Sequence, residues 1–92
     1  MYHVYILRCS DGAFYVGQSQ DLAKRLQVHQ SGKGPAFTAV RLPVELVYQE
    51  SCTTLEESVR RERQLKGWSR SKKHALIAGN DQMLKKLVRS RR

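Results

Sequence analysis

Long hydrophobic runs are missing from this sequence of 92 residues. No stretch approaches the roughly 20 apolar residues that cross a bilayer, and the polar N-terminus lacks the apolar segment of a signal peptide. Cysteine is also scarce, because Cys9 and Cys52 are the only two. Two cysteines cannot form a disulfide framework, or a structural zinc site unless histidines join them. We therefore expect a soluble, cytoplasmic protein with reduced thiols and no membrane partner.

Acidic residues are almost absent from the last third of the chain. Residues 1–62 contain seven Lys/Arg and seven Asp/Glu, whereas residues 63–92 contain ten Lys/Arg and one Asp, so the whole net charge of +9 belongs to the last third. Clustered positive charge gains affinity for phosphates through counterion release, which predicts a nucleic-acid partner. A solvated, solubilising tail is the alternative. The candidate nucleic-acid-binding residues are Lys66, Arg70, Lys72 and Lys73.

The pattern of apolar residues and helix caps predicts one small α+β domain. The runs 2–8 and 13–18 are typical of a β-hairpin, and 44–50 is expected to be a third strand. A loop is expected at 31–43. One helix is expected to begin at Ser19 or Asp21 and to end before "SGKG" at 31–34, and a second to run from Thr53 or Thr54 to about Lys66. A third is expected from Ser69 or Ser71 and ends at Gly79 and Asn80, and a last one starts at Asp81. We expect residues 1–80 to form the domain and 81–92 to be a basic C-terminal helix or tail that continues it.

The length of the hairpin loop decides whether Tyr5 and Tyr15 share a face of the sheet. A two-residue loop places them on opposite faces, because side chains alternate along a strand. A three-residue loop closed by Gly12 in the left-handed region pairs Tyr5 with Gly17 and puts both phenols on one face. This register also collects the aliphatic residues on the other face, so we predict it, with open space above Gly17. The phenols then either close a helix–sheet interface or carry chemistry.

Charged side chains occur on helix faces that are expected to be apolar. Glu62 lies on the inward stripe of its helix, whose apolar members are Leu55, Val59 and Leu65. A carboxylate there is costly unless it meets a cation or a metal, so it forms either an ion pair, for instance with Arg25 or Lys66, or a metal site. Arg25 and His29, four residues apart, share one flank of the first helix. Together with the phenols, these groups suit metal-assisted phosphodiester cleavage, because Mg²⁺ prefers carboxylate oxygen and arginine stabilises departing negative charge.

The order of these residues resembles the GIY-YIG nucleases. The tripeptides "HVY" at 3–5 and "YVG" at 15–17 are similar to the paired signature that names the family. The stretch "YVGQSQDLAKRLQVH" puts Arg25 where the family has its helix arginine, and "EESVRRERQLK" resembles the segment whose metal-binding glutamate falls on Glu62. The segment "HQSGKGPAFT...RLP" is similar to small stand-alone bacterial members of uncharacterised function. The resemblance covers about residues 2–80.

The resemblance implies a three-stranded antiparallel sheet flanked by helices, one divalent metal (Mg²⁺ or Mn²⁺) and hydrolysis of nucleic-acid phosphodiester bonds. By position, it implies that Tyr5 is the base or positions the water, that Tyr15 contacts the phosphate or bonds within the site, and that Arg25 stabilises the transition state. It also implies that Glu62 ligates the metal, and that His29 acts beside the arginine as a base or tunes the tyrosine.

Three positions depart from the family's pattern. His3 replaces the first glycine of the signature, and Gln18 stands where many members carry lysine. Asn80 is the only candidate for the downstream asparagine of many members, and its position predicts a helix C-cap instead.

The function expected from these observations is a metal-dependent DNA endonuclease, structure-selective and linked to DNA repair or processing. Its substrate would be branched or single-stranded DNA, with a protein partner for targeting, a cytoplasmic or nucleoid location and no small-molecule substrate. The alternatives are a nucleic-acid-binding module with this fold and little or no activity, and an adaptor for an acidic protein. An inward Glu62 favours the enzyme, because a carboxylate beside a bound phosphate would repel it. Trp68 either stacks on a base or, more commonly for a lone tryptophan, packs at the sheet edge.

Overall fold

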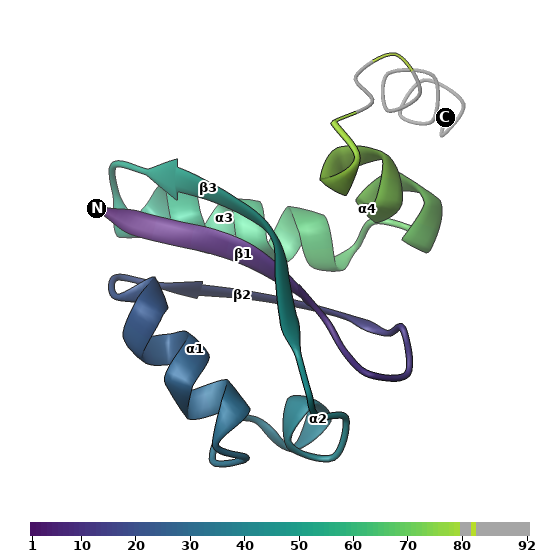
Figure 1. The fold of residues 1–92 in the computed structure, drawn as a ribbon. Coiled ribbons are helices and arrows are strands. Elements are labelled where there is room, and N and C mark those ends of the chain that lie inside the picture. The colour runs from purple at the N-terminus through teal and green to yellow at the C-terminus, as the bar shows by residue number, and fades with distance from the viewer. Residues whose placement is uncertain (80–81, 83–92) are drawn as a thin grey trace.

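The computed structural model describes residues 1–79 and 82, which form one three-stranded sheet with helices on both faces (Figure 1). The elements are β1 (Tyr2–Arg8), β2 (Phe14–Ser19), α1 (Leu22–Gln30), α2 (Ala36–Ala39), β3 (Glu45–Cys52), α3 (Leu55–Lys66) and α4 (Arg70–Ile77). This architecture confirms the predicted α+β class. The predicted helix or tail at 81–92, apart from Gln82, and the predicted cap at Asn80 lie outside the described residues. Among the described helices, none is long and apolar enough to cross a membrane.

The hairpin between β1 and β2 has the predicted three-residue loop. The N–H of Cys9 donates to the carbonyl of Ala13 at 2.8 Å, and the N–H of Gly12 donates to the carbonyl of Cys9 at 2.9 Å. Gly12 has a φ of 87°, the left-handed conformation that the loop requires. Tyr5 consequently pairs with Gly17, and both phenols face the same side of the sheet.

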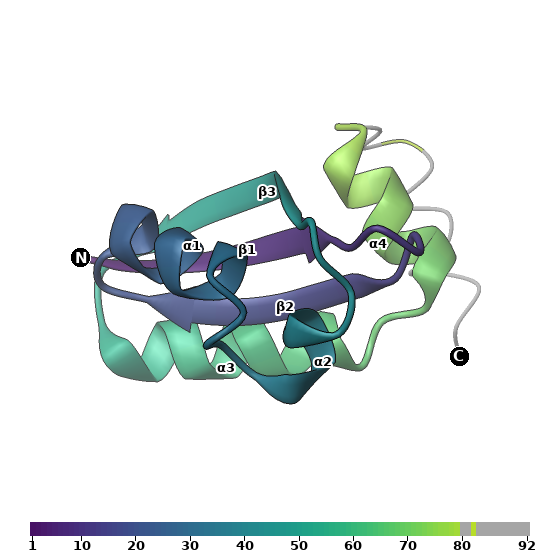
Figure 2. The same ribbon diagram turned by 60° about the horizontal axis from the view of Figure 1, so that its bottom comes forward.

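The two faces of the sheet bury different side chains. The strand order is β2-β1-β3 with both pairings antiparallel, and α1 and α3 lie on opposite sides of it (Figure 2). The face under α3 and α4 has a cluster of Val4, Ile6, Val16, Cys52 and Leu65. The face under α1 and α2 has a cluster of Tyr5, Leu7, Cys9 and Val44. The two cysteines therefore lie in different clusters, each as a free thiol.

The segment 31–43, expected to be a loop, contains the short helix α2. The N–H groups of Thr38 and Ala39 both donate to the carbonyl of Pro35, at 3.1 and 3.0 Å. The segment is tied to the hairpin loop, because the N–H of Ser10 donates to the carbonyl of Arg41 at 3.0 Å. A helix of four residues is too short to produce an apolar periodicity, which explains why the sequence pattern missed it.

The inward side of α3 differs from the predicted stripe. Leu55 is 45% exposed, whereas Ser58 is fully buried. The Ser58 hydroxyl donates to the carbonyl of Leu55 at 2.7 Å, so its polar group is satisfied within the helix. The small side chain lets α3 pack closely on the sheet, and the buried line runs from Ser58 to Leu65. The prediction that Leu55 faces inward was therefore wrong. Burial on this helix follows how closely each side chain fits against the strands and does not follow side-chain apolarity.

Candidate active site

Tyr5, His29 and Thr38 form a hydrogen-bonded chain that joins β1, α1 and α2. The Tyr5 hydroxyl lies 3.0 Å from His29 Nε2, and His29 Nδ1 lies 2.9 Å from the Thr38 hydroxyl. Thr38 donates its own proton to the carbonyl of Pro35 at 3.1 Å, so its oxygen accepts from the Nδ1–H of His29. Nε2 therefore carries the lone pair, and Tyr5 donates to it. The network thus assigns the tautomer of a fully buried histidine.

Arg25 and Tyr15 complete the group of side chains on this face. The Arg25 guanidinium interacts with the phenols of Tyr5 and Tyr15, and the Tyr15 ring centroid lies 5.2 Å from that of His29. Burial raises the pKa of Tyr5, and the interaction with Arg25 opposes that shift. Burial lowers the pKa of His29, and the charge of Arg25 acts in the same direction. Near neutral pH the site thus holds a protonated phenol, a neutral imidazole and a guanidinium.

Glycine at position 17 makes the approach of the phenols feasible. A Cβ added there would lie 2.6 Å from the Tyr5 hydroxyl oxygen and 3.1 Å from Cε2 of Tyr15. The predicted open space above Gly17 is therefore filled by the Tyr5 phenol. Gly34 has a related role beside His29, because its added Cβ would lie 3.1 Å from Nδ1.

Glu62 belongs to α3, the helix on the other face of the sheet. Successive residues of a helix are rotated by about 100°, so Glu62 and its neighbour Arg61 flank the buried line of α3 on opposite sides. The charge of Glu62 contributes to the raised pKa of Tyr5, which places the carboxylate within electrostatic range of the phenol. Its side chain is 21% exposed and pairs with Lys66 Nζ at 3.1 Å. Of the two ion pairs weighed from the sequence, the structure contains the one with Lys66.

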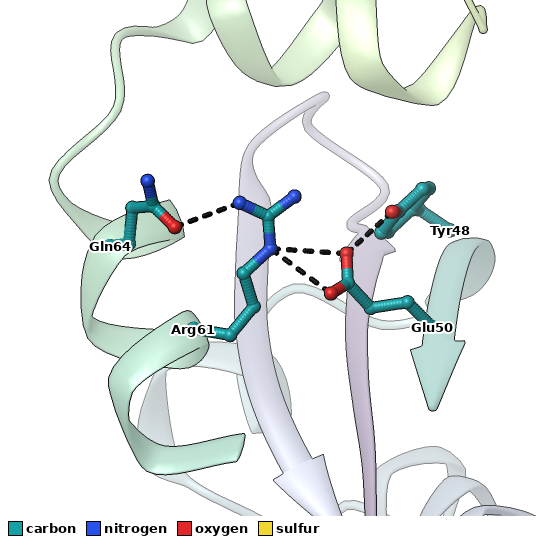
Figure 3. Close-up of polar contacts among 4 residues, drawn as sticks. All are labelled: Tyr48, Glu50, Arg61 and Gln64. Atoms are coloured by element: carbon teal, nitrogen blue, oxygen red, sulfur yellow. Dashed lines mark hydrogen bonds and ion pairs between the residues drawn. The ribbon is translucent and has the colours of Figure 1, made fainter. Parts of the chain in front are cut away.

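Arg61 anchors the opposite flank of α3 to β3 (Figure 3). Its Nε lies 3.1 Å from both carboxylate oxygens of Glu50, and its Nη1 donates to Gln64 at 2.8 Å. Tyr48 donates to the same carboxylate at 2.6 Å, and its pKa is raised to about 12, first by burial and then by Glu50. Glu50, Arg61 and Gln64 line an open pocket of about 480 Å³. The network is half-buried and internally paired, so we interpret it as the support that orients α3, and with it Glu62.

Three of the four predicted phosphate-binding residues reach solvent. Lys66 pairs with Glu62 and keeps 54% of its side chain exposed. Arg70 is exposed at the start of α4, with its guanidinium 4.4 Å from the ring centroid of Phe14. Lys73 is partly buried, and burial together with the charge of Arg70 lowers its pKa. These three cations lie along the end of α3 and the first turn of α4.

Lys72 occupies a different environment from its neighbours. It is only 4% exposed, and its ammonium lies 5.8 Å from the ring centroid of Trp68. Phosphate contact requires an accessible cation, so we leave Lys72 out of the proposed nucleic-acid surface. Trp68 itself packs against the cluster under α3 and α4, with the Arg61 guanidinium 5.2 Å from its ring centroid. Of the two roles weighed for Trp68, base stacking and packing, the structure shows packing.

Thr38 is the site residue that sequence reasoning missed. It lies nine residues after His29 in the segment expected to be a loop, and it is fully buried. A threonine in such a segment has no periodicity or motif spacing that marks it. Only the packing of α2 against α1 reveals that its hydroxyl orients the imidazole.

We expect protonation of His29 to destabilise the domain. The folded-state pKa lies below the ordinary value near 6.5, so the unfolded chain binds the proton more tightly. The associated stability is complete above about pH 6.5 and is lost as the pH falls through the lowered pKa. Urea unfolding at a series of pH values between about 7.5 and 4.5 measures this loss. The variant His29→Gln removes the titrating ring and serves as the control; an identical pH dependence in both proteins would contradict the prediction.

The fold and the site together define the class of protein: a small α+β domain with two phenols, an imidazole and a guanidinium gathered on one face of an antiparallel sheet. Residues 1–75 match the family model described as the GIY-YIG catalytic domain. The chain therefore belongs to the GIY-YIG family, which confirms the resemblance found in its sequence. Membership points to a nuclease superfamily and to a nucleic-acid substrate.

Curated relatives and solved structures support the same assignment. The chain is 43% identical to UPF0213 protein SSP2268 of Staphylococcus saprophyticus over 77 residues, which cover 84% of this chain and 94% of that protein. It is 45% identical to a UPF0213 protein of Bacillus pumilus, over 83% of this chain and 78% of the relative. The solution NMR structure of the UPF0213 protein BH0048 from Bacillus halodurans is 40% identical, with a TM-score of 0.57 over 87% of this chain and 86% of that one. The NMR structure of EF2693 from E. faecalis has a TM-score of 0.59 at 30% identity, over 85% of this chain and 83% of that one.

Proposed function

We propose that this protein is a metal-dependent endonuclease that hydrolyses DNA phosphodiester bonds. The observation that carries the proposal is the hydrogen-bonded series Tyr5–His29–Thr38, with the Arg25 guanidinium next to the Tyr5 phenol. The Tyr5 proton already has a buried acceptor, His29 Nε2, so a cluster that only stabilises the fold does not need the Arg25 guanidinium as well. Hydrolysis needs both, because a proton must leave the attacking water and negative charge develops on the phosphate.

In this proposal Tyr5 and His29 act together as the general base. The raised pKa of Tyr5 disfavours a free tyrosinate as the base. The Tyr5 oxygen instead accepts a proton from the attacking water while its own proton passes to the Nε2 of His29, 3.0 Å away. Thr38 holds the ring so that Nε2 faces the phenol. Arg25 binds the phosphoryl oxygens, and Tyr15 contacts the phosphate beside it.

The residues present fit a magnesium or manganese ion held by one carboxylate. Within the described residues no three His, Cys, Asp or Glu side chains gather into a metal cluster. Mg²⁺ does not require one, since it commonly binds through one or two carboxylates, with water and substrate phosphate completing the shell. Glu62 would hold the ion, exchanging its pair with Lys66 for the metal. When bound, the ion supplies charge stabilisation to the phosphate.

The substrate proposed is branched or single-stranded DNA in repair or processing, in the cytoplasm or at the nucleoid. Lys66, Arg70 and Lys73 would contact its backbone, which gives affinity without sequence readout. A protein partner for targeting is compatible with this small surface.

We expect Mg²⁺-dependent cleavage by the purified protein, abolished by EDTA, when single-stranded, duplex and branched DNA are compared in one assay. The variant Arg25→Ala should lower the rate about a hundredfold, the usual cost of removing a group that stabilises developing charge. The matched control is Arg60→Ala, an exposed arginine on α3. Cleavage that is equal in all three proteins would indicate a contaminating nuclease. DNA binding with no metal-dependent cleavage would instead indicate a binding module.

A further inference from the structure

The short helix α2 exposes apolar side chains beside the site. Phe37 is 39% exposed and Val40 is 77% exposed, and they are two of four large apolar residues that are exposed in the described part of the chain. The other two, Met1 and Leu55, lie at the start of the chain and at the start of α3. Single exposed apolar side chains are common on protein surfaces, so the groups around Phe37 decide whether this one can bind a ligand.

The ring of Phe37 continues a row of aromatic rings from the centre of the site. Its centroid lies 6.1 Å from that of Tyr15, with an interplanar angle of 33°, and Tyr15 lies 5.2 Å from His29. One ring therefore separates Phe37 from the histidine. A ligand on Phe37 would lie next to a phosphate held at Tyr15 and Arg25.

A cation is fixed over the same ring. The guanidinium carbon of Arg41 lies 4.1 Å from the Phe37 ring centroid. Its Nε donates to Asp11 at 3.0 Å, and its Nη1 donates to the carbonyl of Phe37 at 2.9 Å. These three contacts hold the guanidinium plane in place, and the Arg41 side chain is still 32% exposed. The guanidinium covers one face of the Phe37 ring, so its own outer face, which the ring supports, is a flat cationic surface on which a nucleobase can stack.

We propose that Phe37 and Arg41 form a stacking site for an unpaired nucleobase next to the phosphate that is cleaved. This inference rests on the proposed function, and it specifies the substrate as DNA with an unstacked base at the reacting position. A base within a duplex is already stacked and must be freed at a cost of a few kcal/mol, so the site favours single-stranded or branched DNA. A nucleobase is preferred to a protein partner as the occupant because the ring adjoins the Arg41 guanidinium and, through Tyr15, the proposed phosphate site.

The experiment measures binding without cleavage, using the whole protein in EDTA at fixed salt. Two probes are compared: a short thymidine oligonucleotide, and an abasic oligonucleotide of the same length and therefore the same phosphate charge. We expect the wild type to bind the thymidine probe about tenfold more tightly than the abasic one, the usual size of base–aromatic stacking. Phe37→Leu should lose this preference, and Phe37→Trp should keep it. Leu55→Ala, which removes another exposed apolar side chain, is the matched control and should behave as wild type.

The outcomes separate this inference from the proposed function. Equal affinity of the wild type for both probes, or an unchanged preference in Phe37→Leu, would overturn the stacking site even if Mg²⁺-dependent cleavage is found. A preference that depends on Phe37 would support the stacking site even if no cleavage is found. Loss of affinity for both probes to the same degree in Phe37→Leu would also overturn it, because that result indicates a general structural role.

Discussion

Glu62→Gln should lower the rate of metal-dependent DNA cleavage by on the order of a thousandfold. Glutamine keeps the shape of the side chain but lacks the negative charge that a hard divalent cation requires. The fold should tolerate the change, because the ion pair with Lys66 is at the surface and such pairs contribute up to about 1 kcal/mol. The measurement is the single-turnover rate over a range of Mg²⁺ concentrations, with the free energy of unfolding determined in parallel.

Glu56→Gln is the matched control for this prediction. Glu56 is an exposed carboxylate in the first turn of the same helix, and it has no part in the proposed site. Its variant should cleave at the wild-type rate. If Glu62→Gln also cleaves at that rate with the same dependence on Mg²⁺, Glu62 is not the metal ligand.

Gly17→Ala should lower the cleavage rate by about a hundredfold and destabilise the domain by about 1–3 kcal/mol. The new methyl group would lie 2.6 Å from the hydroxyl oxygen of Tyr5 and 2.7 Å from Cζ, the ring carbon that carries this oxygen. Both distances are shorter than contacts between packed atoms. Tyr5 is 1% exposed and hydrogen-bonded to His29, so it has little room to move aside. Displacing the phenol would break the alignment between its oxygen and Nε2, and errors of about 1 Å in such alignments cost about two orders of magnitude.

Gly67→Ala tests whether the effect belongs to position 17. Gly67 is the C-cap of α3 with a φ of −80°, and its added Cβ would meet no atom closer than 3.5 Å, which is ordinary contact. This variant should keep the wild-type rate and stability. The prediction for Gly17→Ala fails if chemical denaturation and cleavage assays give wild-type values for it as well.

Local patterns predicted the hairpin and the N-caps of α1, α3 and α4 correctly, because the interactions that set them act within a few residues. The register around Gly12 followed from the alternation of side chains along two adjacent strands. The α3 cap followed from hydroxyls next to glutamates: Thr54 accepts from the N–H of Glu57 at 3.1 Å, as one of the two predicted capping boxes requires. The alternation that fixed the register also predicted that Tyr5 and Tyr15 share one face of the sheet.

Contacts between elements were beyond such patterns. Thr38, Phe37 and the helix that carries them had no signal in the sequence, since one helical turn forms only where neighbouring elements stabilise it. The burial of Lys72 beside Trp68 was missed for the same reason: a run of basic residues predicts charge but not the side that faces the core.

The sequence by itself determined which chemical groups this protein has and which of them share a strand face or a helix flank. It also determined the family, through two tripeptides and two helical residues at set spacings. Only the tertiary structure decided the direction of the proton in the Tyr5–His29 hydrogen bond and which cation pairs with Glu62. The physical reason is that periodicity acts along one element, whereas hydrogen-bond direction and ion pairing depend on atoms that packing brings together from distant parts of the chain.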